Sequence, residues 1–268
     1  DALLAPRGIR LERSGSMDLG IVRNVAAELA QHDDALCVLG GFGDPLRHAD
    51  FKSVLEILRP RNSKTGAGGG VFGLCVRTSI ADLTPQLCEA LIAHHVDILN
   101  VSIDAWSDET FRRVKGFGRL TKQSRDCKGA DSIAENDSFS EALVDPSSQN
   151  GLADLLAHLE MFVKLQQERH SPTPIVVPEM VKAKENIHEL DEFFDGWLRR
   201  VGAVSVSGYS HFAGQMEDRS VMDMRPPQRL PCRSLRSRCL ILSDGRVALC
   251  DQDFKGLQTF GNIRESTL

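Results

Sequence analysis

The sequence lacks the features that mark several classes of protein. It has no run of about eighteen apolar residues, so a membrane-spanning helix is not expected. Basic residues are not in excess, because 32 Lys and Arg stand against 37 Asp and Glu, a formal net charge of −5. Nucleic-acid binding therefore has no electrostatic support from the chain as a whole. The opening residues, Asp-Ala-Leu-Leu-Ala-Pro, do not have the basic-then-apolar order of a signal peptide. We expect a cytoplasmic protein.

Cysteine occurs seven times, an odd number that does not suit a complete disulfide framework. Without a signal peptide we expect reduced thiols. Three cysteines near the C-terminal end are considered below as metal ligands. The other four lie in apolar runs, in a helical pattern or in a polar stretch, where packing or incidental roles are expected. These four are Cys37, Cys75, Cys88 and Cys127.

Short apolar runs alternate with segments of helical periodicity along most of the chain. Strands that are apolar on both faces and alternate with helices are typical of a parallel sheet in an α/β fold. The pattern alone leaves open whether such a sheet is flat or curled into a barrel. Strands are predicted at 35–41, 71–78, 96–104, 173–180 and 203–210, and helices at 17–31, 50–60, 84–95, 107–114, 151–169 and 185–200.

Two segments depart from this alternation. Residues 116–150 are polar and without a sustained period, which predicts a surface insertion or a loop, with a lid as a further possibility. After Met224 the chain becomes proline-rich, and 238–254 has two apolar arms around an Asp-Gly turn, typical of a β-hairpin. We expect an α/β domain at 1–222 and a small cysteine-containing module at 223–268.

Functional residues of a parallel α/β sheet gather at the carboxyl ends of its strands. The first predicted strand ends in GGFGDP, where glycines allow a ligand to approach the backbone closely and Asp44 offers a carboxylate to an ammonium group. A tight turn with a capping Asp is the alternative for the same residues. The other strand ends carry Arg77, Thr78 and Ser79; Ser102 and Asp104; Glu179 and Asn186; and Ser207, Tyr209 and His211.

Three of these segments together resemble radical S-adenosylmethionine (SAM) enzymes. GGFGDPLRHADF, which starts at Gly40, is similar to the GGEP-type strand of that family. VRTSIADLTPQL is similar to its third strand, with Ser79-Ile80 in place of Asn-Gly, and VDILNVSIDAWSDETFRRVKG to its fourth strand and helix. The resemblance covers about residues 17–115 and 150–268. It implies a partial (β/α)6 TIM-like barrel of parallel strands, in which a 5′-deoxyadenosyl radical made from SAM abstracts hydrogen from a substrate.

The resemblance also implies a cofactor site and a partner. SAM would be held at the first strand end and contacted from two later strands, and a reductant such as flavodoxin or ferredoxin would supply the electron. His211 is a candidate for a substrate role, but the substrate itself is not indicated: it is a peptide, a protein or a small molecule. The implied cofactor-binding residues are Gly40, Gly41, Gly43, Asp44, Ser102, Asp104 and Asn186.

The defining motif of the family, CxxxCxxC, binds a [4Fe–4S] cluster and does not occur in the sequence. We expect that the chain begins just after those cysteines, so that the ligands of the primary cluster lie outside it and the chain alone is inactive. A degenerate, cluster-free homologue is the alternative.

A second cluster motif is present near the C-terminal end. Cys232, twelve residues, Gly245, four residues and Cys250 resemble the opening half of a SPASM or twitch motif, which binds an auxiliary iron–sulfur cluster. Cys239 is a possible further ligand, with a packing role as its alternative, and more thiolates would follow beyond Leu268. Because zinc uses the same residue types, the cysteines alone leave zinc and iron–sulfur open.

Two functions of other classes remain as alternatives. The chain could be a cluster-free scaffold or binding module whose hairpin holds zinc. It could also be a glycosidase-type hydrolase that uses Glu179 and Asp104 as a pair of carboxyl groups.

Overall fold

The computed structural model describes residues 15–41, 43–60, 71–115, 151–214, 216–222, 231–253 and 255–266. The predicted insertion at 116–150, which includes Cys127, and residues 223–230 of the proline-rich segment lie outside these residues. In the described part, five parallel strands form one sheet in the order β1-β2-β3-β4-β5, curved into a half-barrel. The α/β prediction is therefore confirmed. The strands are β1 (Leu36–Leu39), β2 (Gly73–Thr78), β3 (Ile98–Ser102), β4 (Ile175–Lys182) and β5 (Ser205–Gly208).

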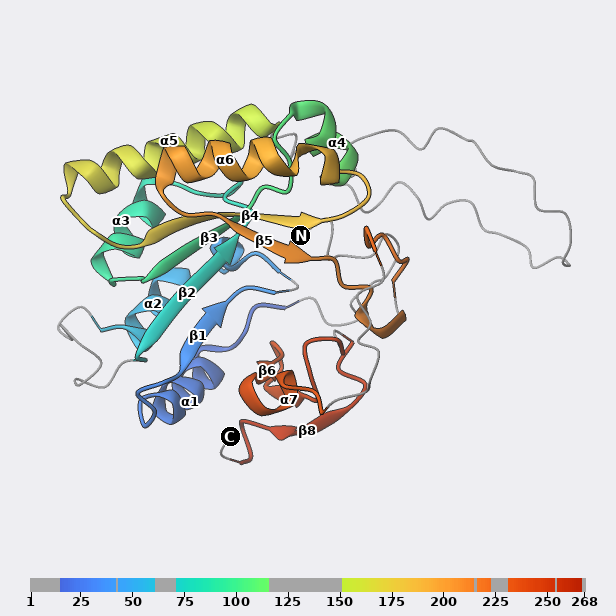
Figure 1. Ribbon diagram of the computed structural model, residues 1–268. Helices are drawn as coiled ribbons and strands as arrows, with labels where there is room; N and C mark the ends of the chain where they lie inside the picture. Colours follow the sequence, from blue (N-terminus) through green and yellow to red (C-terminus); the bar gives the residue numbers. More distant parts are fainter. Residues whose placement is uncertain are drawn as a thin grey trace, which may run out of the picture.

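Helices connect the strands and cover the convex side of the sheet (Figure 1). Local signals place their starts: Thr84 Oγ1 accepts a hydrogen bond from Leu87 N at 3.3 Å, and Ser107 Oγ accepts one from Thr110 N at 3.3 Å. Thr84 and Ser107 thus cap the first turns of the helices that follow them. The helices are α1 (Leu19–Leu29), α2 (Phe51–Leu58), α3 (Pro85–Ala93), α4 (Asp108–Lys115), α5 (Leu152–Glu168) and α6 (Leu190–Val201), with short turns of 3₁₀ helix at η1 (Pro45–Arg47), η3 (Ile187–Glu189) and η4 (Phe212–Gly214).

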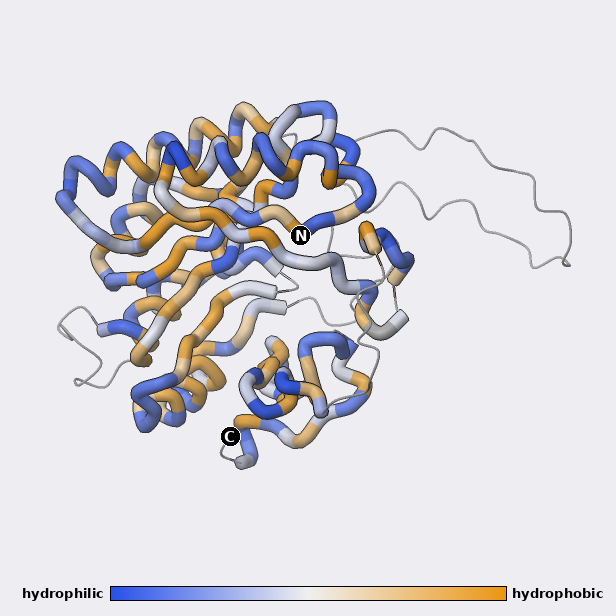
Figure 2. The backbone as a smooth tube through the Cα atoms, viewed as in Figure 1, coloured by the Kyte–Doolittle hydropathy of each residue, from blue (hydrophilic) through white to orange (hydrophobic). Residues whose placement is uncertain are grey.

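The two faces of the sheet differ, which corrects the prediction that each strand is apolar on both. Toward the helices, Leu74 and Leu99 are fully buried in the main core. On the concave face, Leu36 and Val38 of β1 are 53% and 51% exposed, and β2 presents Arg77. The helices among the described residues cover the convex side, and within this part of the chain the concave face is not packed like a core. Figure 2 shows the apolar residues gathered along the strands and the inward sides of the helices.

The C-terminal module is a small antiparallel sheet of β6 (Leu240–Ile241), β7 (Arg246–Ala248) and β8 (Thr259–Asn262), preceded by the short helix α7 (Ser234–Ser237). The predicted hairpin is confirmed, with Gly245 in its turn at φ +90°, and β8 extends it by one strand. The module rests on α1, where Ile263 packs with Ile21 and Val25 and its carbonyl accepts a hydrogen bond from Asn24 Nδ2 at 3.2 Å.

Within the described residues, no helix is both long enough and apolar enough to span a bilayer.

Candidate functional site

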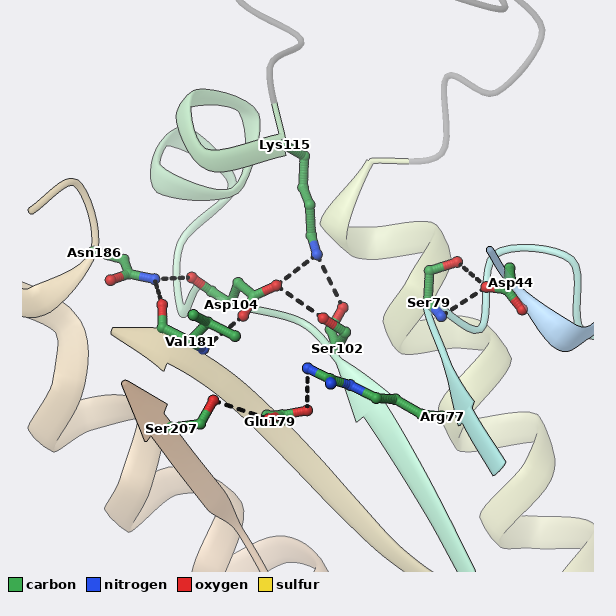
Figure 3. Close-up of polar contacts among 10 residues, drawn as sticks. All are labelled: Asp44, Arg77, Ser79, Ser102, Asp104, Lys115, Glu179, Val181, Asn186 and Ser207. Carbon is green, nitrogen blue, oxygen red and sulfur yellow. Dashed lines mark hydrogen bonds and ion pairs between the residues drawn. The ribbon is translucent and has the colours of Figure 1, made fainter. Parts of the chain in front are cut away.

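Asp44 ties together the carboxyl ends of β1 and β2. Its carboxylate accepts hydrogen bonds from Ser79 N at 2.8 Å and from Ser79 Oγ at 2.6 Å (Figure 3). The same carboxylate accepts one from Thr78 Oγ1 at 2.8 Å. It also accepts one from Leu46 N at 3.0 Å and so caps η1. These donors occupy the roughly four acceptor positions of a carboxylate. The capping role is therefore present, and a direct contact with the amino group of SAM stays a prediction.

The glycines beside Asp44 serve two purposes. Gly40 and Gly41 have φ angles of +142° and +123°, a backbone conformation that other residues rarely adopt. A Cβ on Gly40 would lie 2.7 Å from the backbone oxygen of Arg77, so Gly40 permits the close approach of the two strand ends. A Cβ on Gly41 or Gly43 would meet nothing within 4 Å. This open side of the loop has room for a ligand near the backbone.

A second network closes the ends of β3 and β4 around Asp104, which is 1% exposed and has φ +65°. Asp104 Oδ2 accepts hydrogen bonds from Ser102 Oγ at 2.9 Å and from Lys115 Nζ at 2.6 Å. Its Oδ1 accepts one from Val181 N at 2.7 Å (Figure 3). Lys115, only 7% exposed, was not among the predicted site residues. Its position at the end of a charged helix carried no signal of this contact.

Asn186 belongs to the same network. Its Nδ2 donates to Asp104 O at 2.8 Å and to Val181 O at 3.0 Å, and its Oδ1 accepts from Ala183 N at 2.8 Å. The structure thus brings Ser102, Asp104 and Asn186 together and leaves Asp44 in a separate group (Figure 3). Since the side chain of Asn186 is fully buried and bonded within the protein, its contact with SAM stays a prediction.

Between these two groups, an ion pair crosses the concave face. Arg77 Nη2 lies 3.0 Å from Glu179 Oε2, and Ser207 Oγ donates to Glu179 Oε1 at 3.0 Å. Glu179 forms an ion pair with Arg77 and Asp104 forms one with Lys115, so neither carboxyl group is left free to face a glycosidic bond. This arrangement does not favour the hydrolase alternative.

The end of β5 offers an exposed imidazole. His211 Nδ1 accepts a hydrogen bond from Gly214 N at 2.8 Å, which closes the turn into η4. Nearby, Tyr209 donates from its hydroxyl to Glu217 O at 3.0 Å. A substrate role for His211 stays a prediction.

The three C-terminal cysteines are accessible but not gathered. Cys232 and Cys239 are exposed and Cys250 is half-buried. In the described part of the chain, no group of three or more His, Cys, Asp or Glu side chains is placed to hold a metal ion. Hydrogen bonds from the backbone amides of Leu235 and Ser234 lower the pKa of Cys232, which favours the thiolate that a metal would need. As arranged, these cysteines do not form a cluster site, and their ligand role stays a prediction.

The strand and helix cysteines behave differently. Burial raises the pKa of Cys37, of Cys75 and of Cys88 to about 11 in each case. These thiols stay protonated at neutral pH, as expected of packing residues.

Comparison with known proteins finds a sequence relative for part of the chain. No family model matches the chain. An uncharacterized protein of Treponema pallidum (strain Nichols) is 36% identical in an alignment 118 residues long that covers 42% of this chain. The chain spans about a third, 33%, of the length of this curated relative.

Solved structures match over nearly the whole chain. Tagged anSMEcpe with bound AdoMet (SAM) has a TM-score of 0.58 at 12% identity, covering 95% of this chain and 68% of that one. Native anSMEcpe with bound AdoMet and the Cp18Cys peptide has a TM-score of 0.57 at 12% identity, and the match covers 96% of this chain and 72% of that one. Streptococcus suis SuiB bound to the precursor peptide SuiA has a TM-score of 0.60 at 13% identity, and the match covers 99% of this chain and 59% of that one. At such identities the likeness is one of fold: the chain is structurally similar to radical SAM enzymes with SPASM domains.

Proposed function

We propose that this chain is the barrel portion of a radical SAM enzyme that acts on a peptide. The observation that carries the proposal is the joint match of the half-barrel and the C-terminal module to one AdoMet-bound protein over 95% of the chain. The GGFGDP and Ser-x-Asp segments support it from the sequence. The peptides bound to native anSMEcpe and to SuiB support a peptide substrate.

In this proposal the first strand end receives SAM. The open space beside Gly41 and Gly43 fits a ligand that contacts the backbone, and Gly40 keeps the loop close to β2. Asp44 would hold the amino group of SAM. Because its acceptor positions are already used, a hydroxyl of Thr78 or Ser79 would have to turn away for direct contact. The network of Ser102, Asp104 and Asn186 would fix the neighbouring strand ends and offer further contacts.

When bound, SAM with its iron–sulfur cluster supplies the 5′-deoxyadenosyl radical. The described cysteines do not fit a cluster as they are arranged, so no step is assigned to them. We propose that the ligands of the primary cluster come from sequence outside the 268 residues. The role of Cys232, Cys239 and Cys250 at an auxiliary cluster remains part of the proposal, as does reduction by a flavodoxin or ferredoxin.

The test uses the product of the whole coding sequence beside the 268-residue chain. Both are purified without oxygen, supplied with iron and sulfide, and incubated with SAM and dithionite, and 5′-deoxyadenosine is measured by mass spectrometry. We expect release by the longer protein and none by the 268-residue chain. Release by that chain alone would refute an external primary cluster, and absence of release from both would refute the proposed activity.

Metal analysis of the same samples separates the scaffold alternative. Iron with sulfide in the longer protein supports the proposal. Zinc without iron would favour a scaffold whose hairpin holds zinc.

A further inference from the structure

A cluster of polar side chains lies on the concave face of the sheet, close to the carboxyl ends of the strands. Its members are Arg77, Asn100, Glu179 and Ser207. The strand register pairs Arg77 with Asn100, and Ser102 with Glu179, and paired residues of neighbouring strands face the same side. Arg77 on β2 reaches past β3 to Glu179 on β4, and Ser207 on β5 bonds to the same carboxylate (Figure 3). The cluster therefore spans four strands.

The cluster is incompletely hydrogen-bonded. Arg77 Nε, Asn100 Oδ1 and Glu179 Oε2 are buried atoms that have no hydrogen-bond partner among the described residues, although Oε2 faces the guanidinium as an ion pair. Buried polar atoms in native proteins nearly always find a partner, because leaving them unpaired is costly. Glu179 is 6% exposed, whereas the side chain of Arg77 is 26% exposed. The guanidinium thus stays partly accessible from the concave side.

The charge and surroundings of the cluster suit a neutral, dipolar ligand. One cation faces one anion, so an added charged group would disturb a balanced pair. The adjacent row of side chains on the same face, toward the start of the strands, is apolar. The register aligns four residues in this row, Val38, Cys75, Ile98 and Ile175. Val38 and Ile175 are each 51% exposed. A peptide group next to an apolar side chain would therefore match both the polar cluster and the apolar row beside it.

We propose that Arg77 and Asn100, beside Glu179, bind a peptide group of the substrate. Its carbonyl accepts from the Arg77 guanidinium and its N–H donates to Asn100 Oδ1. An apolar side chain lies over Cys75 and Ile98, which precede Arg77 and Asn100 by two residues on the same face. This inference rests on the proposed function for the identity of the ligand as substrate, and it goes further by naming the residues and the chemical group that they recognise.

The test follows the Arg77 side chain directly. The chain is labelled with ¹⁵N-arginine, and the Nε–H signal of Arg77 is assigned by its loss in Arg77→Lys or, if that variant does not fold, through its bonded backbone resonances. N-acetyl-leucine N′-methylamide, a blocked amino acid with two amide groups, is titrated in. We expect a saturable shift of the Arg77 signal and, for Asn100→Ala, binding weaker by about threefold to tenfold.

Two controls make the titration specific. Arg112→Lys on α4, at a side chain that is 65% exposed, should leave the titration unchanged. Isoamyl acetate, an ester with a similar apolar group and no N–H donor, should shift the Arg77 signal less. Any of three results would overturn the site. The Arg77 signal could stay unmoved up to the solubility limit of the amide, the ester could shift it equally, or Asn100→Ala could bind the amide with unchanged affinity. Missing SAM cleavage beside a positive titration would count against the proposed function and not against this site.

Discussion

At the scale of single residues, the carboxylate of Asp44 joins the carboxyl ends of β1 and β2 at the candidate SAM site. Asp44 accepts hydrogen bonds from Thr78, Ser79 and Leu46, which come from the end of β2 and the start of η1. The sequence offered two roles for Asp44, a ligand contact and a cap. The cap depends only on neighbouring residues and was visible in the sequence, whereas the bonds to β2 depend on strand pairing.

Replacing Asp44 with Asn should destabilise the fold. The amide keeps the size of the side chain but places an NH₂ group among donors that need an acceptor, so we expect a loss of about 1–3 kcal/mol in the free energy of unfolding. Urea denaturation followed by circular dichroism measures it. Asp82→Asn is the matched control, since Asp82 is 48% exposed and lies 3.7 Å from Arg47, and its loss should stay within about 1 kcal/mol. Equal effects of both substitutions would contradict the bridging role.

The buried pair of Lys115 and Asp104 gives a second prediction at this scale. Lys115→Met removes the cation and leaves a buried carboxylate without its charge partner, so we expect a loss of about 3–5 kcal/mol in unfolding free energy. Adding Asp104→Asn removes the charge that was left behind. The double variant should therefore recover part of that loss, which a double-mutant cycle in urea quantifies. Strictly additive losses would show that the two side chains are not coupled.

At the scale of elements, Glu189 links η3 to the start of α4. Its carboxylate accepts hydrogen bonds from Trp106 N at 2.7 Å, from Ser107 N at 3.2 Å and from Ser107 Oγ. Burial raises the pKa of Glu189, but these hydrogen bonds together outweigh it, so that the pKa lies below its ordinary value of 4.5. A carboxyl with a lowered pKa in the folded state stabilises the fold above its unfolded pKa, and this stabilisation is lost as the pH falls through the folded pKa.

Glu189→Gln should consequently change the pH dependence of stability. We expect the wild-type protein to exceed the variant most near neutral pH, and the difference to shrink as the pH falls below 4.5. Urea denaturation from about pH 7 to about pH 3 measures this trend. Glu192→Gln, at an exposed position in the first turn of α6, is the control and should follow the wild-type curve. A constant difference across the pH range would contradict the assigned role of the Glu189 charge.

At the scale of the whole molecule, the C-terminal module is joined to the half-barrel through α1. Ile263 is 4% exposed and packs against Ile21 and Val25. Ile263→Ala should reduce the unfolding free energy by about 2–4 kcal/mol in a single cooperative transition, because it opens a cavity between the two parts. Phe260→Ala on the same module, at a side chain that is 73% exposed, should have little effect. Two separate transitions, or a native-like midpoint for Ile263→Ala, would show that the module is not held by this contact.

The sequence by itself determined the parts of this protein that depend on nearby residues. The alternation of strands and helices follows from hydrophobic periodicity, the caps at Thr84 and Ser107 from side chains within one turn, and the hairpin at Gly245 from a two-residue turn signal. The α/β class followed from these together. The SAM contacts and the cluster ligands that the resemblance implied stay predictions.

Only the tertiary structure decided which polar side chains meet. Arg77 and Glu179 become partners because parallel strands are aligned by order and register, and no local pattern states that alignment. Lys115 meets Asp104 because the end of α4 lies beside the end of β3, which also depends on the packing of the helix on the sheet. The same holds for the concave face. A strand rich in apolar residues predicts burial, but whether its second face is packed or open depends on what lies across from it in space.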